Sequence, residues 1–250
     1  MSATPAPASS VSPDTTDDEI QPIFSYHCKT VKAKQRATVW ESAPVIWING
    51  FPGTGKLTIA TQLVRLIGKD RAVLIDNHQL IDNVKLPRRH PQYWEARALE
   101  RQKAFRAYVL APHMQHKTII FTDFQTDSDN GTDTSLEYLE AAFRAGRPFL
   151  PVSLTCSESE NIRRVTNPAR CWTEAGGQKN KLTNAFVLRC YLTLSLFDFD
   201  EFDCFHEVKR DGVVVDVTEL DAVVAAEMIL REAKRSRKGK EVVREVGYGW

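Results

Sequence analysis

VIWINGFPGTGKLTIA, residues 45–60, joins an apolar run to a glycine-rich turn and then to a segment with helical spacing. Within it, Gly50, Gly55 and Lys56 stand at the spacing G-x-x-x-x-G-K of a phosphate-binding P-loop. In such a loop, successive main-chain N–H groups and a helix N-terminus point at one spot, where a chain of phosphates can be held. Lys56 adds a compact cation for the β- and γ-phosphates. The stretch therefore predicts a strand, a phosphate-binding loop and a helix.

One position of this loop departs from the usual pattern. The residue after the lysine is commonly Ser or Thr, whose hydroxyl binds magnesium, but here it is Leu57, and a hydroxyl follows only at Thr58. The alternative interpretation is a plain turn that binds nothing. We favour the P-loop because a plain turn has no need of a lysine beside three glycines. The residues expected to contact nucleotide are Gly50, Pro52, Gly53, Thr54, Gly55, Lys56, Leu57 and Thr58.

The composition of the 250 residues is that of a globular protein with one substantial core, at 42% hydrophobic and 26% charged. A formal charge of +1 gives no general argument for nucleic acid or membrane as a partner. No run is apolar and long enough to span a bilayer, and residues 1–20 lack the pattern of a secretory signal, so we expect a cytoplasmic location. An odd number of cysteines without a C-x-x-C pair predicts reduced, mostly buried thiols, not disulfides or a zinc site. They are Cys28, Cys156, Cys171, Cys190 and Cys204.

Both ends of the chain differ from the middle. Residues 1–40 are expected to be disordered or loosely docked, since their first half has almost no large apolar side chains. Residues 41–233 form the expected domain, and residues 234–250 a basic tail. The run KRSRKGK (residues 234–240) fits a nuclear-localisation or nucleic-acid-binding patch, but no aromatic side chains interleave with the charges. We therefore favour a solvated tail.

Between the tails, strand and helix patterns alternate, which predicts an α/β fold with a parallel sheet covered by helices on both faces. The expected strands are Val45–Asn49, Ala72–Asp76, Thr118–Asp123, Phe149–Thr155 and Val213–Val217. The expected helices are Lys56–Ile67, Gln92–Ala111, Ser135–Ala145, Ser157–Val165, Leu182–Phe197 and Leu220–Ala233, with Gly146 as a helix stop.

Two strands end in a carboxylate. Asp76 closes the second strand, where ligands of open α/β sheets gather, and could orient an acceptor hydroxyl and take its proton. The alternative is that Asp76 caps the segment that follows. Asp123 ends the run TIIFTD, the form of a Walker B segment, and is the leading candidate for binding magnesium. His78 and Asp82 are weaker candidates.

Arginines form a second group of candidates. Arg97 and Arg101 are four residues apart and share one helix face. The segment around Arg163, Arg164 and Arg170 predicts a lid that closes over phosphates. It also contains Gly176, Gly177, Lys179 and Lys181. The alternative is that these arginines are surface residues paired with Glu158, Glu160 or Glu100.

Several segments together resemble the P-loop small-molecule kinases, and within them chloramphenicol phosphotransferase-like and gluconate kinase-like proteins. They are GFPGTGKLT (50–58), LIDNHQLID (74–82), the Arg97/Arg101 helix, IIFTD (119–123), and NIRRV with the later KLT (161–183), so the resemblance covers roughly residues 42–232. It implies a three-layer P-loop NTPase fold of nucleoside-monophosphate-kinase type, with a five-stranded parallel core and a small lid. It also implies ATP as donor and a small acceptor with a hydroxyl group.

The resemblance assigns roles to individual residues. Asp76 corresponds to the acidic residue that serves as acceptor-binding group or base, and Thr58 to a hydroxyl that contacts the α-phosphate. Arg163, Arg164 and Arg170 correspond loosely to lid arginines. We expect Lys56, Asp76 and Arg170 to act in catalysis, with Arg163 and Arg164 on the nucleotide and Asp123 on Mg²⁺.

The leading hypothesis is an ATP-dependent kinase for a small molecule, and GTP would fit the loop equally well. Leu57 removes one magnesium ligand while leaving the phosphate cradle intact, so binding should survive better than catalysis. The alternatives are a non-catalytic nucleotide-binding protein and a simple NTPase. The acceptor and the oligomeric state do not follow from the sequence.

Overall fold

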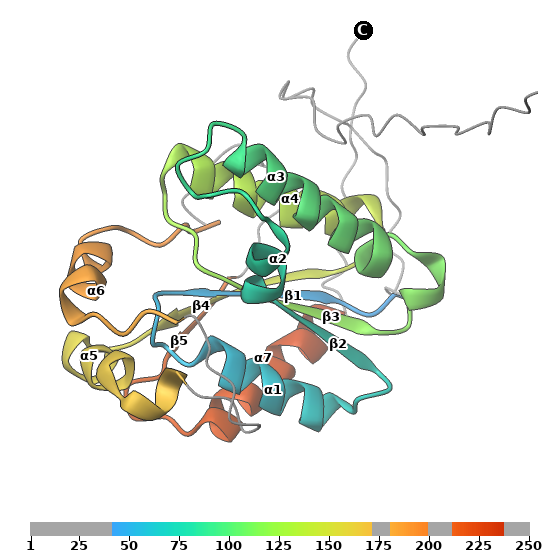
Figure 1. Cartoon of the computed structure of the whole chain (residues 1–250). Helices are drawn as coiled ribbons and strands as arrows, with labels where there is room; N and C mark the ends of the chain where they lie inside the picture. The colour runs from blue at the N-terminus through green and yellow to red at the C-terminus, as the bar shows by residue number, and fades with distance from the viewer. Residues whose placement is uncertain (1–41, 172–180, 200–211, 238–250) are drawn as a thin grey trace, which may run out of the picture. The chain divides into compact units, whose positions relative to one another are not determined.

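The structure, a computed structural model, describes residues 42–171, 181–199 and 212–237 (Figure 1). Its strands are β1 (Val45–Gly50), β2 (Ala72–Asp76), β3 (Thr118–Asp123), β4 (Phe149–Thr155) and β5 (Val213–Asp216). Its longer helices are α1 (Lys56–Ile67), α2 (Asn77–Asn83), α3 (Tyr93–Ala104), α4 (Asp129–Arg144), α5 (Glu158–Thr166), α6 (Ala185–Leu192) and α7 (Ala222–Arg237). Short turns add a π-helix η1 (Phe105–Val109) and 3₁₀ helices η2 (Pro112–Met114) and η3 (Pro168–Cys171).

The five strands form one parallel sheet in the order β2-β3-β1-β4-β5. All their carboxyl ends therefore meet at one edge, which lies beside α5 and α6 in Figure 1. Alternate residues of the central strand β1 face opposite sides of the sheet. Ile46 and Ile48 pack with α1 and α7, whereas Val45 and Trp47 pack with α3, η1 and α4.

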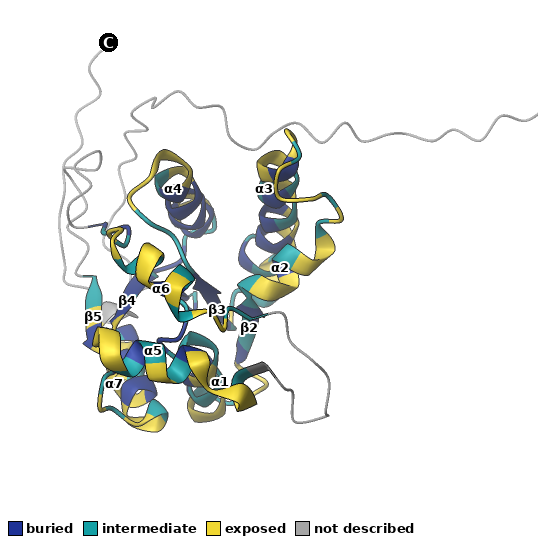
Figure 2. Cartoon of the chain, turned by 60° about the vertical axis from the view of Figure 1, so that its left-hand side comes forward, coloured by how far each residue is buried: buried dark blue, intermediate teal, exposed yellow. Residues whose placement is uncertain are grey.

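Two apolar cores result, one on each face of the sheet. Figure 2 shows the buried residues concentrated in the strands and on the inner sides of the flanking helices. Full burial of each large aliphatic side chain contributes about 1.5–3 kcal/mol, so these two layers account for most of the favourable free energy of folding. The three-layer α/β architecture with a five-stranded parallel core is as predicted.

Arg147 holds together the opposite edge of the sheet, where the strands begin. Its buried guanidinium donates to carbonyl oxygens of Ala43 (2.9 Å), Tyr108 (3.1 Å), Val109 (3.3 Å), Met114 (2.9 Å), Gln115 (3.4 Å) and Lys117. Burial lowers the pKa of Arg147 to about 10, so the group still carries its charge at neutral pH. These bonds satisfy buried carbonyl groups of several segments at once.

All strands agree with the predicted ranges to within one residue at each end, and α1 agrees at both ends. The helix predicted for residues 92–111 is present from Tyr93 to Val109, but only α3 is α-helical, since it ends at Ala104 and the π-helix η1 follows directly. Helix α4 begins before the predicted start at Ser135, since the Ser128 side chain accepts from the N–H of Gly131 and caps it there. Gly146, at φ 61°, follows the end of α4, as predicted.

Two more differences concern helices near the candidate site. Helix α6 is shorter than the predicted range 182–197 because Asn184 caps its start, accepting from the N–H groups of Phe186 and Val187. Helix α2 was not predicted. The basic run 234–240 begins inside α7, which extends to Arg237.

Some predictions lie outside the described residues. They concern residues 1–40, Gly176, Gly177 and Lys179 of the expected lid, Cys28 and Cys204, and the end of the basic tail. Cys156 and Cys190, the cysteines whose side chains the structure describes, are free thiols, as expected, but Cys156 is half-buried and Cys190 exposed, so the expected burial was wrong for both. Within the described residues, no helix is long and apolar enough to cross a membrane.

Candidate functional site

Three neighbouring strand ends create the candidate site. In the sheet register, Asp76 of β2 lies beside Thr122 of β3, and Asp123 lies beside Asn49 of β1. The glycine-rich loop starts directly after β1. The sheet order thus brings together the loop and the two carboxylates that the sequence singled out.

The loop has the geometry of an anion-binding helix start. Gly53 and Gly55 have φ values of 99° and 90°, in the left-handed region that favours glycine. Gly55 is the N-cap of α1, makes no side-chain capping bond, and no acidic residue lies in the first turn. The N–H groups of the first turn have no carbonyl partner within the helix. The helix start is therefore suited to phosphate oxygens.

Lys56 lies across this loop. Its Nζ donates to the carbonyl oxygens of Gly50 (2.5 Å) and Phe51 (2.9 Å), which use two of its three N–H donors. The pKa of Lys56 is lowered from 10.5 to about 7, mainly by burial and also by Arg170 and Lys181, while Asp123 and Asp76 act in the opposite direction. The charged form of Lys56 is therefore disfavoured in this position. A further anion beside Nζ, such as a phosphate, would stabilise it.

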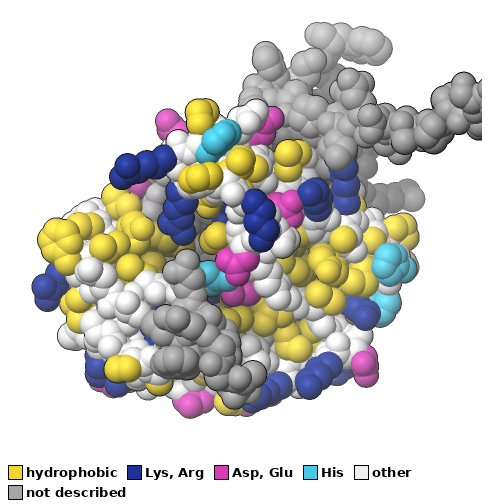
Figure 3. Space-filling view, viewed as in Figure 1, with side chains coloured by type: hydrophobic (Ala, Val, Ile, Leu, Met, Phe, Trp, Pro, Cys, Tyr) yellow, Lys and Arg dark blue, Asp and Glu magenta, His cyan; other side chains and the backbone are white. Residues whose placement is uncertain are grey.

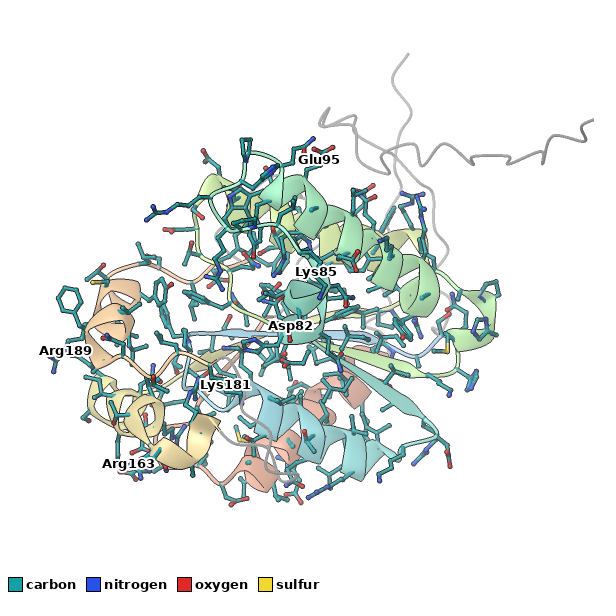
Figure 4. All side chains as sticks on the ribbon, viewed as in Figure 1. Asp82, Lys85, Glu95, Arg163, Lys181 and Arg189 are labelled. Atoms are coloured by element: carbon teal, nitrogen blue, oxygen red, sulfur yellow. The ribbon has the colours of Figure 1, made fainter. Side chains whose placement is uncertain are left out.

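The charges around Lys56 come from both sides of the strand ends. Arg170, in η3, donates from Nε to the carbonyl oxygen of Leu182 at 3.1 Å. Figure 4 shows Lys181 near the start of α1, with Asp82 in α2 and Lys85 just after that helix. In Figure 3, acidic side chains and a histidine gather over α2 near the middle of the same face. Cations and carboxylates thus surround one small region.

Asp76 is half-buried and has two structural partners. Its carboxylate accepts from the Thr122 hydroxyl at 2.5 Å, and it forms a capping box with Gln79, whose Oε1 accepts from the Asp76 N–H at 3.2 Å. The capping geometry that the sequence left open is therefore present. A carboxylate has about four acceptor positions, so capping leaves room for a further contact.

Asp123 is more enclosed, at 1% exposed. Its Oδ1 accepts from Asn77 Nδ2 (2.6 Å) and from the Phe124 N–H (2.8 Å), and its Oδ2 from the Tyr138 hydroxyl (3.0 Å). Three of its acceptor positions are thus occupied. Asp123 fits a magnesium ion that is held mainly by phosphate oxygens and waters, as magnesium prefers, with at most one bond from this carboxylate.

A buried polar layer supports Asp123; its arginines, Arg97 and Arg101, were candidates in the sequence, but their partners Asn77 and Glu137 were missed. Arg97 donates from Nη2 to Asn77 Oδ1 (2.7 Å), which orients the amide that reaches Asp123. Arg101 makes a bidentate pair with Glu137 (2.7 and 2.9 Å). The place of Asn77, directly after a strand-end carboxylate, was a usable signal, whereas nothing in the sequence marked Glu137.

Arg163 and Arg164 are already paired. Both donate to Glu160, at 2.6 Å from Nε in each case, and hydrogen bonds from Arg163 and then Arg164 lower the pKa of Glu160 to about 2. Arg164 also donates to the carbonyl oxygens of Val217 (2.7 Å) and Thr218 (3.1 Å). In Figure 4, Arg163 lies on the side of α5 away from Lys181. These contacts match the surface-pair alternative.

The remaining predicted loop residues differ in exposure. Thr54 is buried and donates to the Phe51 carbonyl at 3.0 Å, Leu57 is half-buried, and Thr58 is exposed.

His78 lies beside Asp76, and burial lowers the pKa of His78. Within the described residues, no three His, Cys, Asp or Glu side chains are placed to hold a metal ion.

A hollow of about 500 Å³ lies between the start of α4 and residues 196–198. Four carboxylates line it together with Thr132, Leu196 and Phe197: Asp127, Asp129, Asp133 and Asp198. None of its lining residues belongs to the glycine-rich loop.

Comparison with solved structures gives the same architecture. A candidate kinase from Chloroflexus aurantiacus superimposes with a TM-score of 0.50 at 12% identity, covering 78% of this chain and 98% of that one. The chain has a P-loop kinase fold. Other structural neighbours are an APS kinase from Mycobacterium tuberculosis, with AMPPNP and APS bound (TM-score 0.48, 12% identity, 77% and 98% covered), and shikimate kinase from Acinetobacter baumannii (0.46, 15%, 78% and 96%). No family model and no curated protein matches the sequence.

Proposed function

We propose that this protein binds a nucleoside triphosphate on the loop 50–58 and transfers its γ-phosphoryl group to a hydroxyl of a small molecule. The supporting observation is that the Lys56 ammonium lies near two carboxylates in different environments. Asp123 is buried with three of its acceptor positions occupied, whereas Asp76, at the end of the neighbouring strand β2, is half-buried. Two carboxylates with such different surroundings suit two different roles.

The residues divide the chemistry as follows. The loop N–H groups and Lys56 hold the β- and γ-phosphates, and Arg170 offsets negative charge that develops during transfer. Asp76 orients the acceptor hydroxyl and takes up its proton. A bound Mg²⁺ would neutralise phosphate oxygens, with Asp123 as its protein contact. ATP is the proposed donor, and the loop alone does not distinguish it from GTP.

Leu57 supports one competing function, a protein that binds nucleotide without turning it over. A side chain without oxygen cannot ligate magnesium, so the loop retains its phosphate contacts and loses one metal ligand. A simple NTPase is the third candidate, in which water takes the place of the acceptor.

Two substitutions test the proposed roles. Lys56→Ala should abolish ATP binding, and Asp76→Asn should leave binding within about twofold and reduce phosphoryl transfer by about 100-fold or more. Asp82→Asn, on the exposed side of α2, is the matched control and should change neither. Equal loss of ATP binding in the Lys56 and Asp76 variants would contradict these assignments.

A screen of small hydroxyl compounds with labelled ATP and Mg²⁺ measures the reaction itself. Transfer of label to an acceptor supports the kinase. Saturable binding without transfer or hydrolysis, with excess Mg²⁺ or Mn²⁺, favours the non-catalytic protein. Hydrolysis that no acceptor accelerates favours the NTPase.

A further inference from the structure

Asn161 of α5 is buried without any hydrogen bond to its side chain. It is 0% exposed, and within the described residues neither Oδ1 nor Nδ2 has a partner. A buried amide group that makes no hydrogen bond destabilises the folded protein, because it has lost its bonds to water and gained none in return. Most buried polar groups in proteins have partners, so an exception asks for an explanation in another state of the protein.

The side chain of Asn161 lies against the phosphate loop. A Cβ atom added to Gly53 would lie only 2.1 Å from Asn161 Oδ1 and 2.6 Å from Val165 Cγ2. No side chain larger than that of glycine fits between the loop and α5 at this point. The unmet amide therefore contacts the segment whose conformation a phosphate chain would change.

A second buried asparagine shows what a purely structural amide looks like here. Asn49 is also 0% exposed, but its Oδ1 accepts from the N–H groups of Gly50 and Gln125 (2.9 Å each), and its Nδ2 donates to the Gln125 carbonyl (2.9 Å). Asn49 directly precedes the loop, and Asn161 lies against Gly53 within it. One amide is satisfied in this structure and the other is not.

We propose that Asn161 is a positioning residue for nucleotide binding: its side-chain amide hydrogen-bonds the main chain of the loop around Gly53 when a nucleoside triphosphate is bound. The amide has one acceptor and two donors, so it can accept from a loop N–H and donate to a loop carbonyl. In the unliganded protein this capacity is unused. Binding of phosphates to the loop then stabilises the α5 contact.

This contact also links the loop to the segment after α5. Helix α5 carries Asn161 on its loop side and Glu160, Arg163 and Arg164 elsewhere, and η3 with Arg170 follows it. Arg164 fixes the helix to the residues after β5. A hydrogen bond between the loop and Asn161 would therefore connect the loop to α5, which Arg164 already anchors to the residues after β5. The proposal rests on nucleotide binding at the loop, as proposed above.

Leu has the shape of Asn without its polar atoms, so Asn161→Leu separates the two roles of the amide. In the full-length protein we expect its unliganded melting temperature to stay equal or to rise by about 2–4 °C, because an unmet amide is removed. Its affinity for Mg·ATP, measured by calorimetry, should fall about 10-fold. Asn161→Asp and Asn161→Gln should recover less than half of the lost Mg·ATP affinity. Neither side chain places both an acceptor and donors where the amide of Asn161 does.

The matched control is Asn49→Leu, which should lower the melting temperature of the unliganded protein by several degrees because three hydrogen bonds are lost. A clear loss of unliganded stability in Asn161→Leu would overturn the proposal, because the amide would then have a structural partner such as a buried water. Unchanged Mg·ATP affinity in that variant would overturn it as well. If the wild-type protein itself bound no nucleotide, the function proposed for the loop would fail first, so the two failures are distinguishable.

Discussion

Lys56 Nζ donates to the carbonyl oxygen of Gly50 at 2.5 Å, so the cation of the loop is bonded to the residue at which the loop begins. This contact holds the ammonium group inside the loop before any ligand is present. Burial of this group is the main reason why the pKa of Lys56 is lowered to about 7. The charge state of Lys56 should therefore respond to a bound phosphate near neutral pH.

The first prediction concerns the pH dependence of ATP binding. A triphosphate favours the ammonium form, so the pKa of Lys56 should be higher in the complex than the value of about 7 in the free protein. Between these two pKa values, binding takes up a proton, and the affinity should fall about tenfold for each pH unit. Calorimetry at pH 6 to 9 in buffers of different ionisation enthalpy measures both effects.

The same group affects stability with a definite sign. Its folded-state pKa lies below the ordinary 10.5, so between pH 7 and 10.5 the unfolded chain binds more protons than the folded one. The free energy of unfolding without ligand should therefore rise with pH in this window because of Lys56. A Lys56→Met variant should lose this component, and an unaltered pH profile in that variant would refute the assigned pKa.

The second prediction separates the two kinds of arginine near α5. The Arg163 guanidinium is exposed and paired with Glu160, so Arg163→Gln should change ATP affinity by less than about twofold. Arg170 lies close enough to Lys56 to lower its pKa, so Arg170→Gln should weaken ATP binding by about 10-fold or more, as loss of a charged hydrogen bond does. A fluorescent ATP analogue measures both, and a larger effect at Arg163 would restore the lid role predicted for it.

The third prediction concerns the buried pair Arg101–Glu137, whose residues are 4% and 5% exposed. Arg101→Met or Glu137→Leu alone should lower the free energy of unfolding by about 3–5 kcal/mol, since each leaves a buried charge unpaired. The double variant should lose much less than the sum. Urea unfolding measures these values, and Arg235→Met, which breaks an exposed pair with Glu232, should stay within about 0.5 kcal/mol. Additive losses in the double variant would mean that the pair has no coupling.

The parts of the fold that were predicted depend on local patterns. Every strand is a short apolar run, and the loop 50–58 has a fixed spacing, so both could be read from neighbouring residues. The errors lie where tertiary contacts decide. Helix α2 is short and polar, and it forms because Asp76 caps it. The change from α3 to a π-helical turn at Phe105 has no local signal, since Phe105 and Val109 are set by packing against β3 and α4.

For the site, the sequence identified side chains at strand ends but not their partners. Asp76 and Asp123 were recognisable because strand ends are where ligands gather. Their different surroundings come from Asn77 and Tyr138, which reach Asp123 from two separate helices. The unmet amide of Asn161 is visible only once the distance to Gly53 is known. Such pairings between distant residues need coordinates.

Because of Arg147, the amino ends of the strands are more extensively crosslinked than the carboxyl ends, where the phosphate loop lies. At the amino-terminal edge of the sheet, one guanidinium crosslinks the chain before β1, the turns after α3 and the residue before β3. Amide hydrogen exchange should therefore be slowest there and fastest around the loop at the carboxyl edge. We therefore expect conformational change on ligand binding to be confined to the carboxyl ends of the strands, while their amino ends keep their positions.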